Sequence, residues 1–252
     1  MIQPAFHTPR ILASGNHAAE PFGWTSYNWS GYAITANEGT VTQVMGEWSV
    51  PTVRPSHLSS SYSACWVGID GFNNSSLIQA GTEQDASLCS ESYYAWWEIL
   101  PNPSQPIDPN TYPVFPDDRV SVSITRGADG RWTISIQNLT QSWAFTQSNL
   151  SYTGPSSSAE WIVEAPLVNG RIARLAHYSQ IPFSTCQING HSPELVMSDG
   201  GVLIQCNRQV STPSAPNPNG DGFNMAYGSR QPSAPSSQVA SVPSPTTSSP
   251  AP

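Results

Sequence analysis

The sequence predicts an all-β protein built as an antiparallel β-sandwich, and three observations point to this fold class. Between residues 22 and 229, short segments rich in Val, Ile, Thr, Tyr and Trp alternate with clusters of Gly, Pro, Asn and Asp. One pair of segments shows the period-two alternation of apolar and polar residues that is typical of half-buried strands. No pattern of helical period extends beyond about two turns. Many antiparallel strands in a chain of 252 residues favour two packed sheets.

The clearest element is a β-hairpin over residues 119–138. Gly127 and Gly130 mark its turn. Apolar residues alternate with polar ones on both sides of this turn, and they are Val120, Val122, Ile124, Trp132, Ile134 and Ile136. This alternation predicts that one face of the hairpin is buried.

Further strands are predicted from shorter segments of the same kind. In chain order they cover residues 41–50, 64–69, 76–81, 93–100, 159–164, 173–180 and 201–205.

The composition divides the chain into three parts. We expect residues 1–21 to be an N-terminal arm or the remnant of a propeptide, and residues 22–229 to form the sandwich. Residues 230–252 are mostly Pro, Ser, Thr, Ala and Gln, with little apolar surface to offset the entropy of ordering. We expect this tail to be disordered.

The charge pattern narrows the classes of partner. The formal net charge is -8 at pH 7, and all nine basic residues are Arg. No basic stripe offers phosphate contacts, so no nucleic acid partner is expected. No run of about 20 apolar residues could cross a bilayer, so no membrane association is expected.

Four cysteines form two pairs of sequence neighbours. In a chain rich in Ser and Thr, an even number of cysteines predicts disulfides and a secreted protein. Sequence proximity favours the pairs Cys65–Cys89 and Cys186–Cys206. Zinc is the competing interpretation, but neither C-x-x-C nor H-E-x-x-H spacing occurs. We therefore expect neither a metal nor another cofactor.

The familiar hydrolase motifs do not fit this sequence. There is no G-x-S-x-G motif. Asp70-Gly71 and Asp199-Gly200 lack the hydroxyl residue of the aspartic peptidase triplet. A cysteine nucleophile is not expected if all four cysteines are paired.

Polar residues instead interrupt several segments that otherwise look like core strands. These are Trp66-Val67-Gly68-Ile69-Asp70-Gly71, Leu77-Ile78-Gln79-Ala80-Gly81, Tyr94-Ala95-Trp96-Trp97-Glu98 and Ala159-Glu160-Trp161-Ile162-Val163-Glu164-Ala165-Pro166. With Asn28-Trp29-Ser30-Gly31 before them, they resemble the glutamic peptidases, or eqolisins. Fungal members carry W-V-G-I-D-G, L-Q-T-G, A-W-Y-E-W and A-E-W-I-V-E in the same order.

The resemblance implies a peptidase on a sandwich of two antiparallel seven-stranded sheets. It places the family's glutamine on Gln79 and its catalytic glutamate on Glu164, the second Glu of its segment. Glu160 and Glu164 share one face of a predicted strand and lie about 13 Å apart at four residues' spacing. They therefore cannot share a proton as a dyad.

A Glu and Gln pair has a physical rationale of its own. A carboxyl group with a pKa near the usual value of about 4.3 is still partly ionised in acid. Glu164 can then take a proton from the attacking water and return it to the leaving amine. The side-chain N–H of Gln79 can stabilise the oxyanion without a titrating charge. Such a pair works where a histidine base would be protonated.

Four further residues are candidates for substrate binding. The resemblance places Trp66 and Trp96 in the substrate cleft, although both could be core aromatic residues. Asp70 is either a residue of the site or the start of a turn, the commoner role of Asp-Gly. Glu98 shares a face with Trp96 and either contacts substrate or lies at the surface.

We therefore expect a monomeric endopeptidase that acts on proteins or peptides in acid. The alternative is a carbohydrate-active jelly roll. It would be either a glycoside hydrolase using Glu98 with Glu164, or a binding module in which Trp66, Trp96 and Trp97 stack on sugars.

Overall fold

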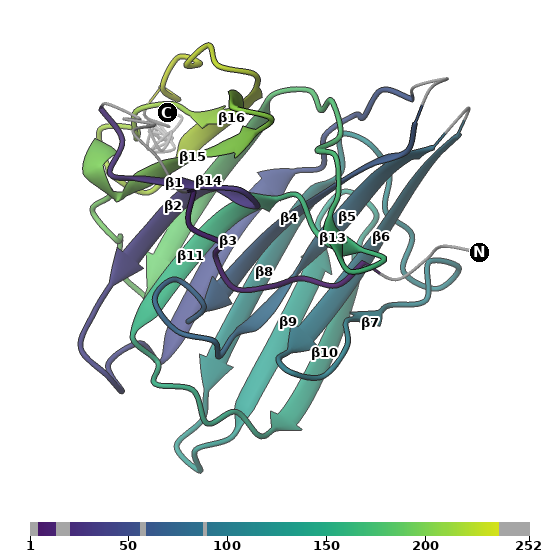
Figure 1. Ribbon diagram of the computed structural model, residues 1–252. Coiled ribbons are helices and arrows are strands. Elements are labelled where there is room, and N and C mark those ends of the chain that lie inside the picture. The colour runs from purple at the N-terminus through teal and green to yellow at the C-terminus, as the bar shows by residue number, and fades with distance from the viewer. Residues whose placement is uncertain (1–4, 14–20, 56–58, 88–89, 237–252) are drawn as a thin grey trace, which may run out of the picture.

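The computed structural model describes residues 5–13, 21–55, 59–87 and 90–236, and this part of the chain is all-β (Figure 1). Its strands are β1 (Trp24–Ser26), β2 (Trp29–Thr35), β3 (Gln43–Ser49), β4 (Ser61–Ile69), β5 (Ile78–Ser87), β6 (Ser90–Ile99), β7 (Gln105–Pro106), β8 (Arg119–Arg126), β9 (Trp132–Asn138), β10 (Trp143–Leu150), β11 (Ser158–Glu164), β12 (Leu167–Val168), β13 (Arg171–Ile172), β14 (Ile181–Ile188), β15 (Gly200–Gln205), β16 (Arg208–Pro213) and β17 (Phe223–Tyr227). A single 3-10 turn, Met197–Asp199, is the one helical element of the described residues. None of the helical structure described has the length or apolar character needed to span a membrane.

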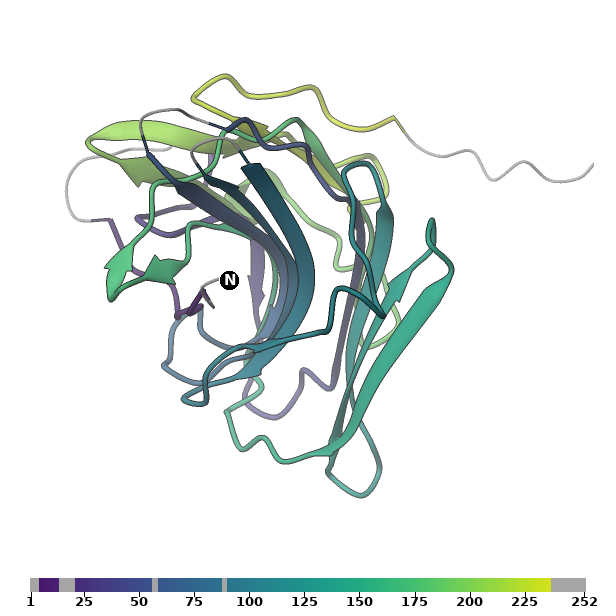
Figure 2. The ribbon, with the colours of Figure 1, turned by 90° about the vertical axis from the view of Figure 1, so that its right-hand side faces the viewer.

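A continuous path of hydrogen-bonded strands folds over into two layers (Figure 2). The path runs β10-β9-β8-β3-β14-β17-β16-β15-β2-β11-β4-β5-β6-β7, and β1 joins β15 in parallel. The layer containing β4, β5 and β6 is strongly curved, and the layer containing β8, β9 and β10 packs on its convex side. The predicted all-β antiparallel sandwich is confirmed. Hydrogen bonds through β15, β16 and β17 nevertheless join the layers, which are not two separate sheets.

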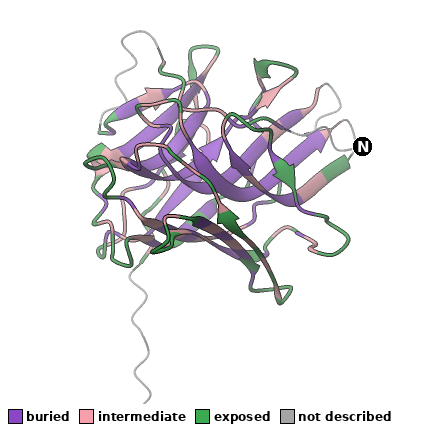
Figure 3. Ribbon diagram, turned by 90° about the horizontal axis from the view of Figure 1, so that it is seen from below, coloured by how far each residue is buried: buried purple, intermediate pink, exposed green. Residues whose placement is uncertain are grey.

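The curved layer is buried on both faces. Its convex face meets the other layer in the main core, whose largest fully buried side chains include Trp48, Trp132, Trp161, Phe183 and Phe223. Its concave face carries a second apolar cluster that includes Trp29, Trp66, Leu77, Tyr94, Trp96 and Ile162. Figure 3 shows the resulting concentration of buried strands, with exposed residues mostly in loops and edges. Polar side chains on the concave face are therefore removed from water.

The sequence-based strand predictions hold best where both strands of a hairpin alternate. The predicted hairpin at residues 119–138 is formed by β8 and β9, paired from Val120 opposite Asn138 to Arg126 opposite Trp132. The continuous strand predicted at residues 173–180 is wrong. Leu175 and Tyr178 form only isolated bridges there.

The structure contradicts the predicted disulfide between Cys186 and Cys206, because both are free cysteines. Cys186 lies in the main core on β14, whereas Cys206 is exposed in the turn after β15. Cys65 is also a free, buried thiol, and its predicted partner Cys89 lies outside the described residues. Sequence proximity does not reveal that Cys186 is buried in the core while Cys206 is exposed in a turn.

The first and the last described segments lie on different parts of the sandwich. Residues 5–13 follow the concave side of the curved layer, where Figure 2 shows the N-terminal segment. Residues 230–236 contain no strand. The tail predicted to be disordered lies mostly outside the described residues, from residue 237 onward.

Candidate active site

Alternate residues of four neighbouring strands, β11, β4, β5 and β6, build a polar group within the concave face. In β11, Glu160, Ile162 and Glu164 point to this side because side chains alternate along a strand. The residues between them belong to the main core, and they are Ala159, Trp161 and Val163. One strand thus supplies two acidic side chains to the same face.

Gln79 of β5 lies directly opposite Glu98 of β6. Its Nε2 atom donates a 2.7 Å hydrogen bond to Glu98 Oε2, and both side chains are fully buried. Burial raises the pKa of Glu98 to about 9, and the charge of Glu164 adds to the rise. Hydrogen bonds from Gln79 and the backbone of His7 and Ser104 partly offset it. In acid, Glu98 is therefore an uncharged partner that holds the amide of Gln79 in place.

Glu164, at the end of β11, receives hydrogen bonds on both carboxylate oxygens. Trp66 Nε1 donates to Oε2 over 2.9 Å, and the backbone N–H of Thr8 donates to Oε1 over 3.2 Å. His7 Nδ1 lies 3.1 Å from Oε2. A buried carboxylate needs such N–H partners to remain charged. Of the predicted pair, Glu164 is thus supplied with donors and Gln79 with a neutral acceptor.

His7 is a site residue that the sequence did not indicate. Its ring stacks on Trp96, with centroids 3.6 Å apart and an angle of 7° between planes. Its Nε2 atom lies 3.5 Å from Glu83 Oε2, while Nδ1 faces Glu164. The stacking places an imidazole between two acidic side chains. No local sequence pattern could show this contact, because His7 lies 157 residues from Glu164.

Glu83 and Asp85 of β5 are two further acidic residues that sequence reasoning missed. Burial raises the pKa of Glu83 well above its usual value, and the charge of Asp85 adds to the rise. Burial also raises the pKa of Asp85 to about 7. Glu83 could have been found from its spacing, because it follows Gln79 by four residues in one strand and so shares its face.

Asp70, for which the sequence left a role in the site and the start of a turn both open, holds a neighbouring loop in place. Its carboxylate accepts hydrogen bonds from the Tyr152 hydroxyl at 2.6 Å and from the backbone N–H groups of Ser156 and Ser157 at 2.7 and 2.9 Å. Its φ of 73° agrees with the turn interpretation of Asp-Gly. These contacts support a role in fixing the chain that leads into β11.

Glu160 shares the concave face with Glu164 but has different surroundings. Burial raises its pKa well above the usual value, the charge of Asp70 adds to the rise, and the charge of Arg10 opposes it. Glu160 is therefore uncharged in acid.

Trp66 and Trp96 are both fully buried beside the polar residues of the concave face. Trp66 holds Glu164, and Trp96 carries the ring of His7. Both rings are buried in this structure, where residues 5–8 lie against the concave face.

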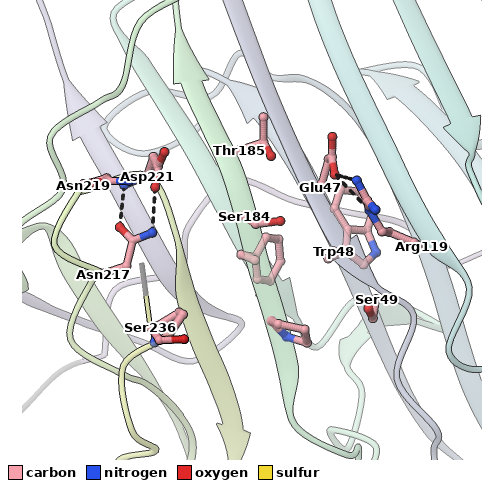
Figure 4. A pocket seen from close by; sticks show the side chains of 13 residues that line it. Glu47, Trp48, Ser49, Arg119, Ser184, Thr185, Asn217, Asn219, Asp221 and Ser236 are labelled. Carbon is pink, nitrogen blue, oxygen red and sulfur yellow. Dashed lines mark hydrogen bonds and ion pairs between the residues drawn. The ribbon is translucent and has the colours of Figure 1, made fainter. Parts of the chain in front are cut away.

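A pocket in the described part of the chain lies away from this group (Figure 4). It has a volume of about 540 Å³ and is lined by residues of β3 and β14 and by loops near residues 217–221. Its polar contacts are the Arg119–Glu47 ion pair and the Asn217–Asp221 hydrogen bond. It contains none of the predicted site residues. Within the described ranges, no three His, Cys, Asp or Glu side chains cluster as metal ligands.

Comparisons with known proteins give a family and a fold. The model of the Peptidase A4 family matches residues 27–227. Scytalido-glutamic peptidase, solved with a peptide based transition state analog, is 22% identical with a TM-score of 0.65, and the match covers 80% of this chain and 98% of that one. No curated protein sequence matches the chain significantly.

Two other solved structures share the fold. SCP-B, an eqolisin in complex with the tripeptide Ala-Ile-His, is 20% identical with a TM-score of 0.60, and the match covers 80% of this chain and 98% of that one. Aspergilloglutamic peptidase from Aspergillus niger is 21% identical with a TM-score of 0.57, and the match covers 66% of this chain and 99% of that one.

Proposed function

Because the chain belongs to the Peptidase A4 family, and is therefore a peptidase, we propose that it hydrolyses peptide bonds in acid with Glu164 and Gln79. One observation carries the choice of site. A peptide segment of the chain itself crosses the concave face and places the Thr8 backbone N–H 3.2 Å from Glu164 Oε1. A carboxylate at this distance from a peptide nitrogen is within reach of a leaving amine.

Glu164 is the general base and then the general acid. Ionised, it takes a proton from the water that attacks the carbonyl carbon. Protonated by that step, it delivers the proton to the nitrogen as the C–N bond breaks. Its N–H donors, of which Trp66 Nε1 is the nearest at 2.9 Å, hold the carboxylate group in place for the proton transfer.

Gln79 stabilises the oxyanion that forms on the attacked carbonyl. An N–H donor held in place before the reaction stabilises developing charge without reorganisation. The hydrogen bond from Nε2 to Glu98 fixes the amide, while its Oε1 atom has no hydrogen-bond partner among the described residues. The Nε2 group has a second N–H, which is the donor that the oxyanion requires.

The buried carboxyl groups around Glu164 and Gln79 support a reaction at acidic pH. Below a pH of about 7, burial keeps Glu98 and Asp85 protonated, since it raises their pKa values to about 9 and about 7. Several carboxyl groups can then lie in one buried site because they are uncharged. At higher pH, Glu98 ionises close to Glu164 and Asp85 ionises close to Glu83, and the like charges of each pair repel.

The substrate is an extended peptide. SCP-B, which shares the fold, binds the tripeptide Ala-Ile-His. In this chain Ala5-Phe6-His7 has the same order of residues, with Phe in place of Ile, and its histidine lies against Trp96 and Glu164. This parallel supports a site on the concave face that binds peptides. We also propose that the protein is secreted and monomeric.

The experiment that tests this function offers denatured protein and a panel of polysaccharides to the enzyme between about pH 2 and about pH 7. We expect peptide fragments from internal cleavage at the acidic end, identified by mass spectrometry, and no sugar release. Sugar release without peptide products would overturn the proposal in favour of the glycoside hydrolase alternative. Chelators should leave peptide cleavage unchanged.

A further inference from the structure

A recess beside the candidate active site holds the guanidinium group of Arg10. Arg10 Nε donates a 3.1 Å hydrogen bond to the Phe72 carbonyl, and Nη2 donates a 3.0 Å hydrogen bond to Asn73 Oδ1. The guanidinium carbon lies 3.5 Å from the centroid of the Phe72 ring and 5.7 Å from that of the Trp24 ring. Two hydrogen-bond acceptors and two aromatic rings thus contact one planar cation, which is an arrangement that favours Arg over Lys.

The recess, which consists of Trp24, Phe72 and Asn73, is held in shape by other parts of the fold. Trp24 Nε1 donates a 2.8 Å hydrogen bond to the Asp199 carbonyl. The rings of Trp24 and Phe72 meet edge to face with their centroids 5.5 Å apart. Asn74 Oδ1 accepts the backbone N–H two residues later at 2.9 Å, in the turn that carries both acceptors. These contacts do not involve the N-terminal segment, so the recess is formed without it.

The recess lies two residues along the chain from the backbone group that Glu164 contacts. Thr8 presents its N–H to Glu164, in the position proposed above for the leaving amine. The backbone N–H of Arg10 then donates a 3.0 Å hydrogen bond to the Gly71 carbonyl. A peptide that follows this path from the cleaved bond brings its third residue after that bond to the recess.

The recess binds a cation without an ionised partner. Of the ion pairs among the described residues, none includes Arg10. Glu160 lies close enough for its charge to act on Arg10, but it is uncharged in acid because burial raises its pKa well above the usual value. The guanidinium stays charged in acid, since burial lowers the pKa of Arg10 only to about 10. Carbonyl oxygens and aromatic rings do not titrate, so the recess can bind a guanidinium group at acidic pH.

We propose that Trp24, Phe72 and Asn73 form a substrate subsite that selects Arg at the third position after the cleaved bond. The proposal rests on the proposed function, because the position is counted from the bond that Glu164 attacks. The substrate side chain takes the place that Arg10 has in this structure. Binding energy from a side chain remote from the reacting bond raises kcat/KM when it is kept in the transition state.

Digestion of a mixture of denatured proteins by wild type in acid tests the subsite. Mass spectrometry of the fragments locates the cleaved bonds. We expect Arg at the third position after the cleaved bond at least about three times as often as chance gives. Cleavage without this enrichment would overturn the subsite and leave the proposed function standing. Absence of any cleavage would overturn the proposed function, and the subsite with it.

Synthetic substrates that differ only at this third position measure the size of the preference. We expect kcat/KM for Arg to exceed that for norleucine at least about tenfold, and that for Lys about threefold, because Lys lacks the planar fork. Both ratios should be equal at two acidic pH values about two units apart, since no acceptor of the recess titrates. A preference for Arg that rises with pH would show that an ionised carboxyl group binds the cation, and would overturn the recess as the subsite.

Phe72→Leu tests the recess itself. Leu keeps an apolar side chain but removes the ring that lies against the guanidinium. We expect the ratio of kcat/KM for Arg to that for norleucine to fall at least about threefold. Phe115→Leu, at an exposed position in the loop before β8, is the matched control and should keep the wild-type ratio.

An unchanged ratio in folded Phe72→Leu would place the preference elsewhere and overturn the subsite. If Phe72→Leu does not fold, Asn73→Ala serves the same comparison, because Asn73 is exposed and its side chain supplies the second acceptor. The ratio should then fall about threefold, for the loss of one hydrogen bond to a charged group. An unchanged ratio in Asn73→Ala would likewise overturn the subsite.

Discussion

Gln79 and Glu98 face each other across one antiparallel strand pair, and the amide of Gln79 donates a 2.7 Å hydrogen bond to the carboxyl group of Glu98. Because burial raises the pKa of Glu98 to about 9, this partner is uncharged in acid. The proposed oxyanion donor is therefore oriented by a neutral carboxyl group, not by a carboxylate that would compete with the oxyanion for its N–H groups.

Gln79→Ala tests the oxyanion donor. We expect kcat to fall about 100-fold with little change in KM, because the lost N–H acts mainly in the transition state. Steady-state kinetics on a peptide substrate measure this. Gln137→Ala, at an exposed position of β9, is the control and should behave as wild type. A change in KM alone would mean that Gln79 binds substrate without aiding the chemistry.

Glu98→Gln tests the link between buried acids and pH. A carboxyl group whose pKa is raised in the folded state keeps its proton while the unfolded chain loses it, so the free energy of unfolding falls as pH rises from about 4.5 toward 9. We expect wild type to lose on the order of a few kcal/mol over this range. Glu98→Gln should lose less, since it cannot ionise.

Chemical denaturation at several pH values measures this dependence. Glu91→Gln is the matched control, because Glu91 lies exposed on the same strand. An identical pH dependence in wild type and Glu98→Gln would show that Glu98 ionises normally in the folded protein.

Trp66→Phe tests the hydrogen bond to Glu164. The substitution keeps an aromatic ring but removes the Nε1–H that lies 2.9 Å from Oε2. We expect kcat/KM to fall about tenfold, the loss of one hydrogen bond to a charged group. Trp97→Phe, the neighbour of Trp96 that packs against the main core, should change kcat/KM far less. Equal losses in the two variants would reduce the role of Trp66 to packing.

The cysteines can be tested by alkylation. We expect the exposed Cys206 to react in the folded protein, and Cys65 and Cys186 to react only after unfolding. Burial protects the latter two and raises the pKa of both thiols. Peptide mapping after labelling reads the outcome for each residue. Protection of Cys206 that a reductant reverses would restore the predicted disulfide.

The alternation of apolar and polar residues along the sequence was enough to predict the strands that bury one face. The β8–β9 hairpin follows from strict alternation. Strand β14 was missed because Pro182 interrupts its sequence, and edge strand β10 was missed because none of its residues is buried. Strand β5 extends to Ser87, beyond the predicted end at residue 81, because buried acids continue it. A pattern of polar residues does not reveal that burial has neutralised them.

Some residues of the candidate site could be predicted from local sequence, and others could not. Gln79 and Glu164 were predicted from sequence motifs, and the register then brought Glu98 opposite Gln79. His7 and its contact with Glu164 depend on how a distant segment crosses the sheet. Long-range placement of this kind leaves no periodic signal along the chain, so only the fold could supply it.

The most direct test of the account is kcat/KM on a peptide substrate for Glu164→Gln beside Glu160→Gln, both confirmed as folded. The two residues share one face of β11, and each substitution keeps the size of the side chain. We predict a loss of at least about 1,000-fold for Glu164→Gln, which can no longer accept a proton, and of less than about tenfold for Glu160→Gln. Near-normal activity of Glu164→Gln, or a larger loss for Glu160→Gln, would contradict the assignment of the general base.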